Sequence, residues 1–305
     1  MRRELAIIRT KKWTLEEETL LGSLRRVFGD NILAVFHDLP KDAELPVAAV
    51  SIDSEWVKGA GLRDVSDWGW RCGDYFCYRA REARPDYDHY WMIEPDVYFD
   101  CDVTSFFARF EDSARSGLGL HLRRVGPKDS RFCRGMERGS LFQAVFPITR
   151  FSGSALDLML VRRVELSEGE MKEFVFPNDE VFSFTTLAQD EAHSIADLAD
   201  FAPDLISTDT FTPRPGYLLD AFLGDTERTQ TNKIYHPTRE KAFFCTALAD
   251  RMAGNFRVSN KFAREIGKLS GEDRAKIAHE LGASALKYLE KAARKGSRGK
   301  KVKNA

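Results

Sequence analysis

Short apolar runs alternate with amphipathic stretches over the first quarter of the chain. Residues 5–8, 32–37 and 46–52 are apolar runs of strand length, and Thr14-Leu-Glu-Glu17 is a capping box that predicts a helix to about Phe28. Strand, helix, strand, loop and strand in this order are typical of the opening of a parallel, doubly wound sheet. The pattern therefore predicts an α/β fold with an open, mostly parallel sheet flanked by helices.

The spacing of apolar residues along the rest of the chain predicts the remaining helices and strands. Helices are predicted at 67–81, 104–114, 152–162 and 178–188, and from Pro237, as the first helical position, to Arg251. Strands are predicted at 90–93, 117–122 and 141–148. After Ser259, apolar residues recur among helical charges, which predicts a C-terminal helical appendage. We therefore expect a main α/β domain at 1–255, the appendage at 256–295 and a basic disordered tail at 296–305.

Bulk composition is that of an ordinary folded protein. Among 305 residues, 43% are hydrophobic and 30% charged, with a net charge of −1, which excludes a polycation. Five cysteines without a C-x-x-C pair favour free thiols in a reducing compartment. The first apolar run stops at Arg9, too early for a signal peptide, and we see no run long enough to span a membrane. We expect a cytoplasmic protein.

An acidic turn follows the apolar strand Tyr-Trp-Met-Ile at 90–93. Glu94-Pro95-Asp96 places two carboxylates at the end of a buried strand, where open α/β sheets bind ligands. Mg²⁺ and Mn²⁺ accept such oxygen ligands and bridge to substrate phosphates. The alternative is a solvated acidic loop that follows a core strand.

Five segments, taken in order, resemble glycosyltransferases of the GT-A type. Tyr90-Trp-Met-Ile-Glu-Pro-Asp-Val-Tyr-Phe99 resembles their metal-binding segment, in an E-x-D form of the D-x-D motif. Trp68–Tyr75 resembles the helix that flanks the nucleotide, and Phe146–Ser152 resembles an acceptor-side segment. Pro177–Val181 resembles the acidic helix start near the acceptor hydroxyl. Lys233–Pro237 resembles the late histidine segment that closes on metal and diphosphate. The resemblance spans roughly Leu5 to Arg251 and implies a GT-A-like catalytic domain with a nucleotide-sugar donor and bound Mn²⁺ or Mg²⁺.

The resemblance also implies roles at the reacting end of the donor. Asp96 would ligate the metal directly, Glu94 would act through water or the ribose, and His236 would be a third ligand. An inverting transfer needs a carboxylate base, and Glu180 or Asp179 at a helix start would supply it, while a retaining enzyme would not need one. The alternatives are a helix cap for Asp179 and a surface histidine for His236.

Further residues are candidates for binding the donor. Arg71 and Asp74 would hold ribose or diphosphate, unless they form an ion pair one turn apart. Asp38 and Asp53 each end a predicted strand, and one of them would contact the nucleobase or ribose. Two more candidates come from the basic loop Arg9-Thr10-Lys11-Lys12 and from the late histidine segment, namely Thr10 and Lys233.

On the acceptor side we expect three residues. Arg150 and Ser152 would shape the acceptor pocket, or would cap the following helix, and Trp70 would border a pocket or fill the edge of the core. The sequence predicts a hydroxyl acceptor, on a glycan, a glycolipid or a modified nucleobase, without selecting among them.

Two other classes of function stay open. A sugar-phosphate nucleotidyltransferase shares the fold but usually has a glycine-rich basic loop after the first strand, and Arg9-Thr-Lys-Lys-Trp13 has the positive charge without glycine. A non-catalytic carbohydrate- or nucleic-acid-binding protein is the third reading. The tail from Ala293 to Ala305 has six Lys or Arg and no acid, and it would attract DNA or an anionic membrane surface, or be a solvated terminus.

Overall fold

A computed structural model of the chain describes residues 2–136, 139–170, 172, 175–211, 216–224 and 229–246, together with thirteen positions between 270 and 290. Two compact units divide the chain, Met1–Ala247 and Leu248–Ala305. The described residues from 271 to 290 are helical, as predicted for the appendage. The predicted boundary at 255 and the basic tail at 296–305 lie outside the described residues. No helix of the described residues is long and apolar enough to cross a membrane.

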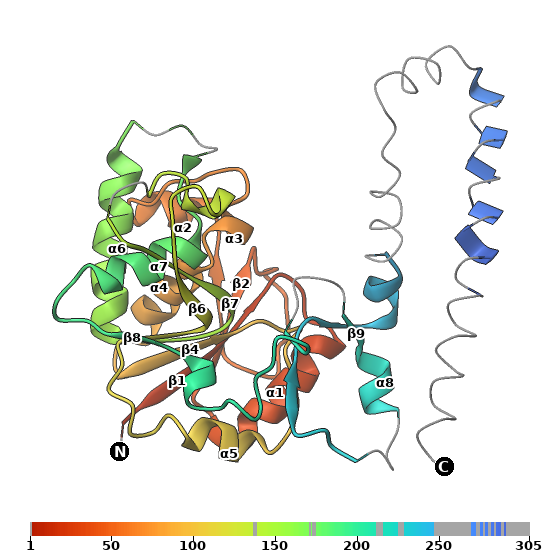
Figure 1. The fold of residues 1–305 in the computed structure, drawn as a ribbon, viewed down its shortest axis with the longest axis horizontal. Helices are drawn as coiled ribbons and strands as arrows, with labels where there is room; N and C mark the ends of the chain where they lie inside the picture. Colours follow the sequence, from red (N-terminus) through yellow and green to blue (C-terminus); the bar gives the residue numbers. More distant parts are fainter. Residues whose placement is uncertain are drawn as a thin grey trace. The chain divides into compact units, whose positions relative to one another are not determined.

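Unit 1 is built on a seven-stranded sheet in the order β3-β2-β1-β4-β7-β6-β8 (Figure 1). Its strands are β1 (Glu4–Thr10), β2 (Ile32–His37), β3 (Ala49–Ile52), β4 (His89–Ile93), β6 (Gly117–Val125), β7 (Leu141–Ser152) and β8 (Ile195–Asp197). Neighbouring strands are parallel except at β7, which is antiparallel to both β4 and β6. The predicted open, mostly parallel α/β sheet is confirmed.

Helices cover both faces of this sheet (Figure 1). They are α1 (Leu15–Phe28), α2 (Ser54–Gly59), α3 (Trp68–Arg71), α4 (Asp74–Ala83), α5 (Val103–Ala108), α6 (Gly153–Glu168), α7 (Asp179–Ala188) and α8 (Leu219–Leu223), with the 3₁₀ turns η1 (Arg131–Cys133) and η3 (Leu198–Asp200). Alternate residues of β1 bury against opposite layers: Leu5 and Ile7 contact the layer of α4, α6 and α7, and Ala6 and Ile8 contact that of α1 and α5. Two hydrophobic cores result, one on each face.

Four short strands complete unit 1. They are β5 (Tyr98–Asp100) with its antiparallel partner β10 (Lys233–Tyr235), and the parallel pair β9 (Tyr217–Leu218) and β11 (Thr238–Arg239). The predicted start of a helix at Pro237 is wrong. Thr238 continues in an extended conformation because its backbone N–H and its hydroxyl both donate to the Asp96 carbonyl, at 2.7 and 3.0 Å. Helical residues begin only at 241.

The predicted helix at 67–81 is broken in two at Gly73. The Gly73 N–H donates to the Asp179 carboxylate at 2.6 Å, and a Cβ at this position would lie 2.5 Å from both Arg9 and Asp179. The contact joins α7 to the start of α4, so tertiary structure overrides the helical period. By contrast, the Thr14 capping box and the Asn178 N-cap form as predicted.

Candidate metal and nucleotide site

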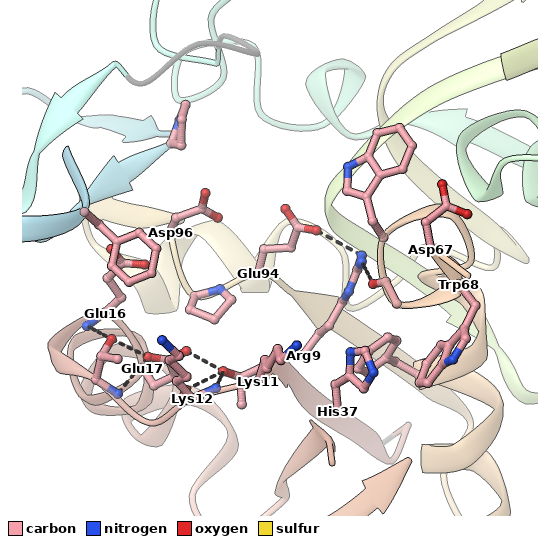
Figure 2. Close-up of a pocket in the computed structure, with 18 of the residues that line it drawn as sticks. Arg9, Lys11, Lys12, Glu16, Glu17, His37, Asp67, Trp68, Glu94 and Asp96 are labelled. Carbon is pink, nitrogen blue, oxygen red and sulfur yellow. Dashed lines mark hydrogen bonds and ion pairs between the residues drawn. The ribbon is translucent and has the colours of Figure 1, made fainter. Parts of the chain in front are cut away.

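The site lies at the point where the strand order of the sheet reverses, between β1 and β4. The chain builds β1, β2 and β3 outwards and then places β4 on the other side of β1. Loops that leave the carboxyl ends of β1 and β4 therefore diverge, and a crevice opens between them. A cleft of about 930 Å³ occupies this place and is lined by Arg9–Lys12 after β1 and by Glu94–Asp96 after β4 (Figure 2).

Three potential metal ligands meet in the cleft. One ligand atom each from Glu94, Asp96 and His236 lies within 4.8 Å of the others. The His236 Nε2 atom is 3.7 Å from Glu94 Oε2 and 3.5 Å from Asp96 Oδ2. Figure 2 shows the Glu94 and Asp96 side chains pointing into the same opening. Two carboxylates and an imidazole form a donor set that fits Mn²⁺ and, with water completing the shell, Mg²⁺.

The late segment of the chain brings His236 to the acidic turn. Pairing of β10 with β5 sets Tyr235 opposite Tyr98, and the hydrogen bonds of Thr238 to Asp96 hold the next residues. The imidazole of His236 stacks on Phe211, with ring centroids 5.5 Å apart. Backbone pairing thus brings His236 next to Glu94 and Asp96, which are far from it in sequence. A local sequence pattern does not reveal this pairing.

Two arginines also contact the acidic pair. Arg9 donates to Glu94 Oε1 at 3.0 Å and to the Gly69 carbonyl, and Arg239 lies 2.6 Å from Asp96 Oδ2. Glu94 therefore keeps Oε2 directed at His236 while Oε1 is held by Arg9. Asp96 differs, because its Oδ2 faces both His236 and Arg239. A cation at this site would compete with Arg239 for that oxygen.

Burial and charge shift the pKa values of the three ligands. Burial opposes ionisation of Glu94, but His236 and Arg9 outweigh it and lower its pKa to about 2. Burial raises the pKa of Asp96, although His236 and Arg239 act against it. Burial also disfavours protonated His236, yet Asp96 and Glu94 raise its pKa overall. Glu94 is therefore the most readily ionised of the three, and a cation bound here would displace protons from Asp96 and His236, whose raised pKa values favour their protonated forms.

Basic and aromatic side chains form the other wall of the cleft. Lys11 and Lys12 follow β1, and Thr10 beside them donates its hydroxyl to Glu17 of α1. His37 at the end of β2 lies 4.4 Å, centroid to centroid, from the Trp68 ring. Ammonium groups near the acidic turn suit the phosphates of a nucleotide, and the rings suit its base.

The two base candidates at the start of α7 differ in their surroundings. Asp179 is 2% exposed and accepts hydrogen bonds from Gly73 N and Glu180 N, so its carboxylate is committed to the backbone. Glu180 accepts only one bond, from Gln143 at 3.0 Å, among the described residues. Burial raises its pKa to about 7, against the lowering effects of Gln143, Arg123 and Arg131. Glu180 is the better placed of the two to exchange a proton.

Some predicted site residues lie in the core instead. Asp74 is buried in a two-bond ion pair with Arg163, at 2.7 and 3.0 Å, and accepts from the Tyr78 hydroxyl. Arg150 pairs with Glu4 at 2.6 Å, and Ser152 caps α6. Both stand opposite the amino-terminal half of β4, away from the Glu94 end, so neither has the position predicted for an acceptor residue.

Most of the remaining candidates are not among the residues that line the cleft. Arg71 pairs with Asp67, one turn before it, rather than with Asp74. Asp53 caps α2, Asp38 lies beside His37 with a positive φ of 60°, and Lys233 donates to the Asp204 carbonyl. Of the predicted donor and acceptor residues, Thr10 and Trp70 line the cleft. Trp70 is 55% exposed there.

Sequence reasoning missed Arg239, His37 and the pairing role of Arg9. Arg239 follows His236 by three residues, but a helix was expected there, and the extended conformation that turns Arg239 towards Asp96 was therefore not predicted. Lys11 and Lys12 were visible as an unusually basic loop, and their place at the end of β1 was the signal for a phosphate site.

Neither the family models nor the curated proteins give a match to the sequence. Solved structures do. A glycosyltransferase involved in the glycosylation of the major capsid of PBCV-1 is 12% identical, with 79% of this chain and 98% of that chain covered and a TM-score of 0.41. Mouse xyloside xylosyltransferase 1 is 10% identical, with 64% and 84% covered and a TM-score of 0.36. The inositol-1-phosphate CTP transferase of T. maritima is 9% identical, with 65% and 86% covered and a TM-score of 0.37. The likeness concerns the fold alone.

Proposed function

We propose that the chain is a metal-dependent glycosyltransferase that moves a sugar from a nucleoside diphosphate donor to a hydroxyl acceptor. The convergence of Glu94, Asp96 and His236 within 4.8 Å carries the proposal. This cluster shares one cleft with Lys11 and Lys12. Divalent cation, diphosphate and basic loop form a charge-balanced set, whereas the acidic turn alone would repel the donor.

The donor set fits a divalent cation. Glu94 Oε2, the Asp96 carboxylate and His236 Nε2 would hold it, and the ion, when bound, would neutralise charge on the departing diphosphate. Lys11 and Lys12 add positive charge on the β1 side. Arg239 is displaced from Asp96 and remains paired with Glu16 Oε2, which it already contacts at 3.1 Å.

Glu180 serves as the base in this proposal. It takes the proton of the acceptor hydroxyl while that oxygen bonds to the anomeric carbon and the carbon–oxygen bond to the diphosphate breaks. A pKa of about 7 suits this role, because an ionised carboxylate of that basicity is available near neutral pH. Direct displacement with one base inverts the anomeric centre.

Nucleotidyl transfer to a sugar phosphate is the second candidate. Lys11 and Lys12 favour it, because they follow the first strand and line the cleft, as a triphosphate-binding loop would. The two reactions differ in their products, since nucleotidyl transfer releases pyrophosphate and glycosyl transfer releases a nucleoside diphosphate.

A thermal-shift screen of nucleoside diphosphates, with and without Mn²⁺, tests the proposed function. A ligand that binds only the native state at a hundredfold over its Kd stabilises by about 2.7 kcal/mol. We expect a Mn²⁺-dependent shift with a uridine or guanosine diphosphate, and its loss in Asp96→Asn. Equal shifts in the wild type and in Asp96→Asn would refute the metal assignment. Pyrophosphate exchange in place of diphosphate release would favour the second candidate.

A further inference from the structure

The end of β6 and the first part of its connection to β7 are rich in cations. From Arg123 to Arg134 they have four arginines and Lys128 against a single acid, Asp129. The Asp129 carboxylate accepts from the Gly126 backbone at 2.6 Å and so forms its own turn. Within the described residues, none of these five cations has a carboxylate within ion-pair distance. Arg123 and Arg124 donate instead to the neutral side chains of Gln143 and Ser140.

This connection is fixed next to the proposed base. Val125, Cys133 and Leu141 bury against Val181 of α7, the residue that follows Glu180. This small hydrophobic cluster holds η1 against the start of α7. It therefore fixes the position of the arginine-rich segment relative to Glu180.

A chain of hydrogen bonds joins one of the arginines to Glu180. Arg123 donates to Gln143 Oε1 at 3.4 Å, and Gln143 donates through Nε2 to Glu180 Oε2 at 3.0 Å. The buried amide of Gln143 thus holds a guanidinium on one side and the carboxylate on the other. Arg123 contributes positive charge beside the base without pairing with it directly.

A second arginine, Arg131, connects this cationic segment to a residue that lines the cleft. The Arg131 guanidinium lies over the Trp70 ring, 5.9 Å from its centroid, and over Phe132 at 5.1 Å. Trp70 lines the cleft and is 55% exposed. The part of the indole that Arg131 leaves exposed offers a platform for a sugar ring, and a guanidinium fork matches the oxygens of phosphate or carboxylate.

We propose that the acceptor is an anionic sugar, bearing a phosphate or carboxylate that Arg123 and Arg131 bind while its ring stacks on Trp70 and its hydroxyl reaches Glu180. This rests on the proposed function and names the acceptor class for the same site. The two arginines offset the repulsion between such an acceptor and the acidic residues around it. A neutral sugar would offer the two guanidiniums no negative group to bind.

Binding to the full chain tests this with three probes: glucose 6-phosphate, glucuronate and glucose, titrated by calorimetry with the nucleoside diphosphate and Mn²⁺ present and again without them. We expect both anionic probes to bind at least about tenfold more tightly than glucose, which corresponds to about 1.4 kcal/mol. The double variant Arg123→Gln/Arg131→Gln should remove that preference, and Arg131→Lys should keep part of it. Arg26→Gln, an exposed arginine of α1, is the matched control and should keep all of it.

Equal binding of the three probes would overturn the inference, and so would an anion preference that survives in the double variant. Loss of the preference in Lys12→Gln alone would also overturn it, because the anion would then occupy the phosphate side of the cleft. Failure of the proposed function is distinguishable, since it appears as no nucleoside diphosphate shift in the same samples. A preference abolished by the double variant supports the inference.

Discussion

Two aspartate–arginine pairs in this protein have the same chemical groups but different surroundings. Asp74 and Arg163 are both fully buried, make two parallel hydrogen bonds and tie α4 to α6. Asp96 is also buried, but its partner Arg239 is 36% exposed and lines the cleft, where His236 faces the same oxygen of Asp96. The first pair is closed and structural, whereas the second can exchange its partner for a ligand.

The contrast also explains what the sequence could foretell. The strands, the capping box and the acidic turn after β4 follow from local patterns, because apolar runs and caps act over a few residues. Asp74 and Asp96 look alike in sequence, since each lies beside an aromatic-rich segment. Only the packing of Arg163 from α6 against Asp74, and of β10 against β5, separates them.

Stability should separate the pairs most strongly. Asp74→Asn leaves the Arg163 charge buried without compensation, so we expect a loss of about 3–5 kcal/mol in the free energy of unfolding. Asp96→Asn should cost less than about 1 kcal/mol, because the released Arg239 can turn to solvent. Urea denaturation of the two isosteric variants measures both. Similar losses would mean that the Asp96 pair is structural too.

Removing the exchangeable partner should improve cation binding. Arg239 competes for Asp96 Oδ2, so Arg239→Gln should raise the affinity for Mn²⁺ alone by about tenfold, or about 1.4 kcal/mol. Electron paramagnetic resonance of free Mn²⁺ gives the affinity without any assay of activity. Arg26→Gln provides the control for a change of net charge. Unchanged or weaker Mn²⁺ binding in Arg239→Gln would contradict the exchange.

A third prediction concerns pH. The pKa of Glu180 is raised to about 7 from an ordinary 4.5, so the folded chain binds an additional proton between these values. The free energy of unfolding should therefore fall as pH rises from 4.5 through 7, while the rate of donor turnover should rise as Glu180 ionises. Glu180→Gln should flatten both dependences. A wild-type rate profile that is flat from pH 5 to pH 8 would argue against Glu180 as the base.

The most direct measurement is the position of the cation itself. Crystals grown with Mn²⁺ and a nucleoside diphosphate can be examined by anomalous diffraction at the manganese edge. The proposed site predicts a peak in contact with Asp96, Glu94 and His236, with Arg239 withdrawn from Asp96. A bound nucleotide with no peak at this position, and with Arg239 still on Asp96, would contradict it.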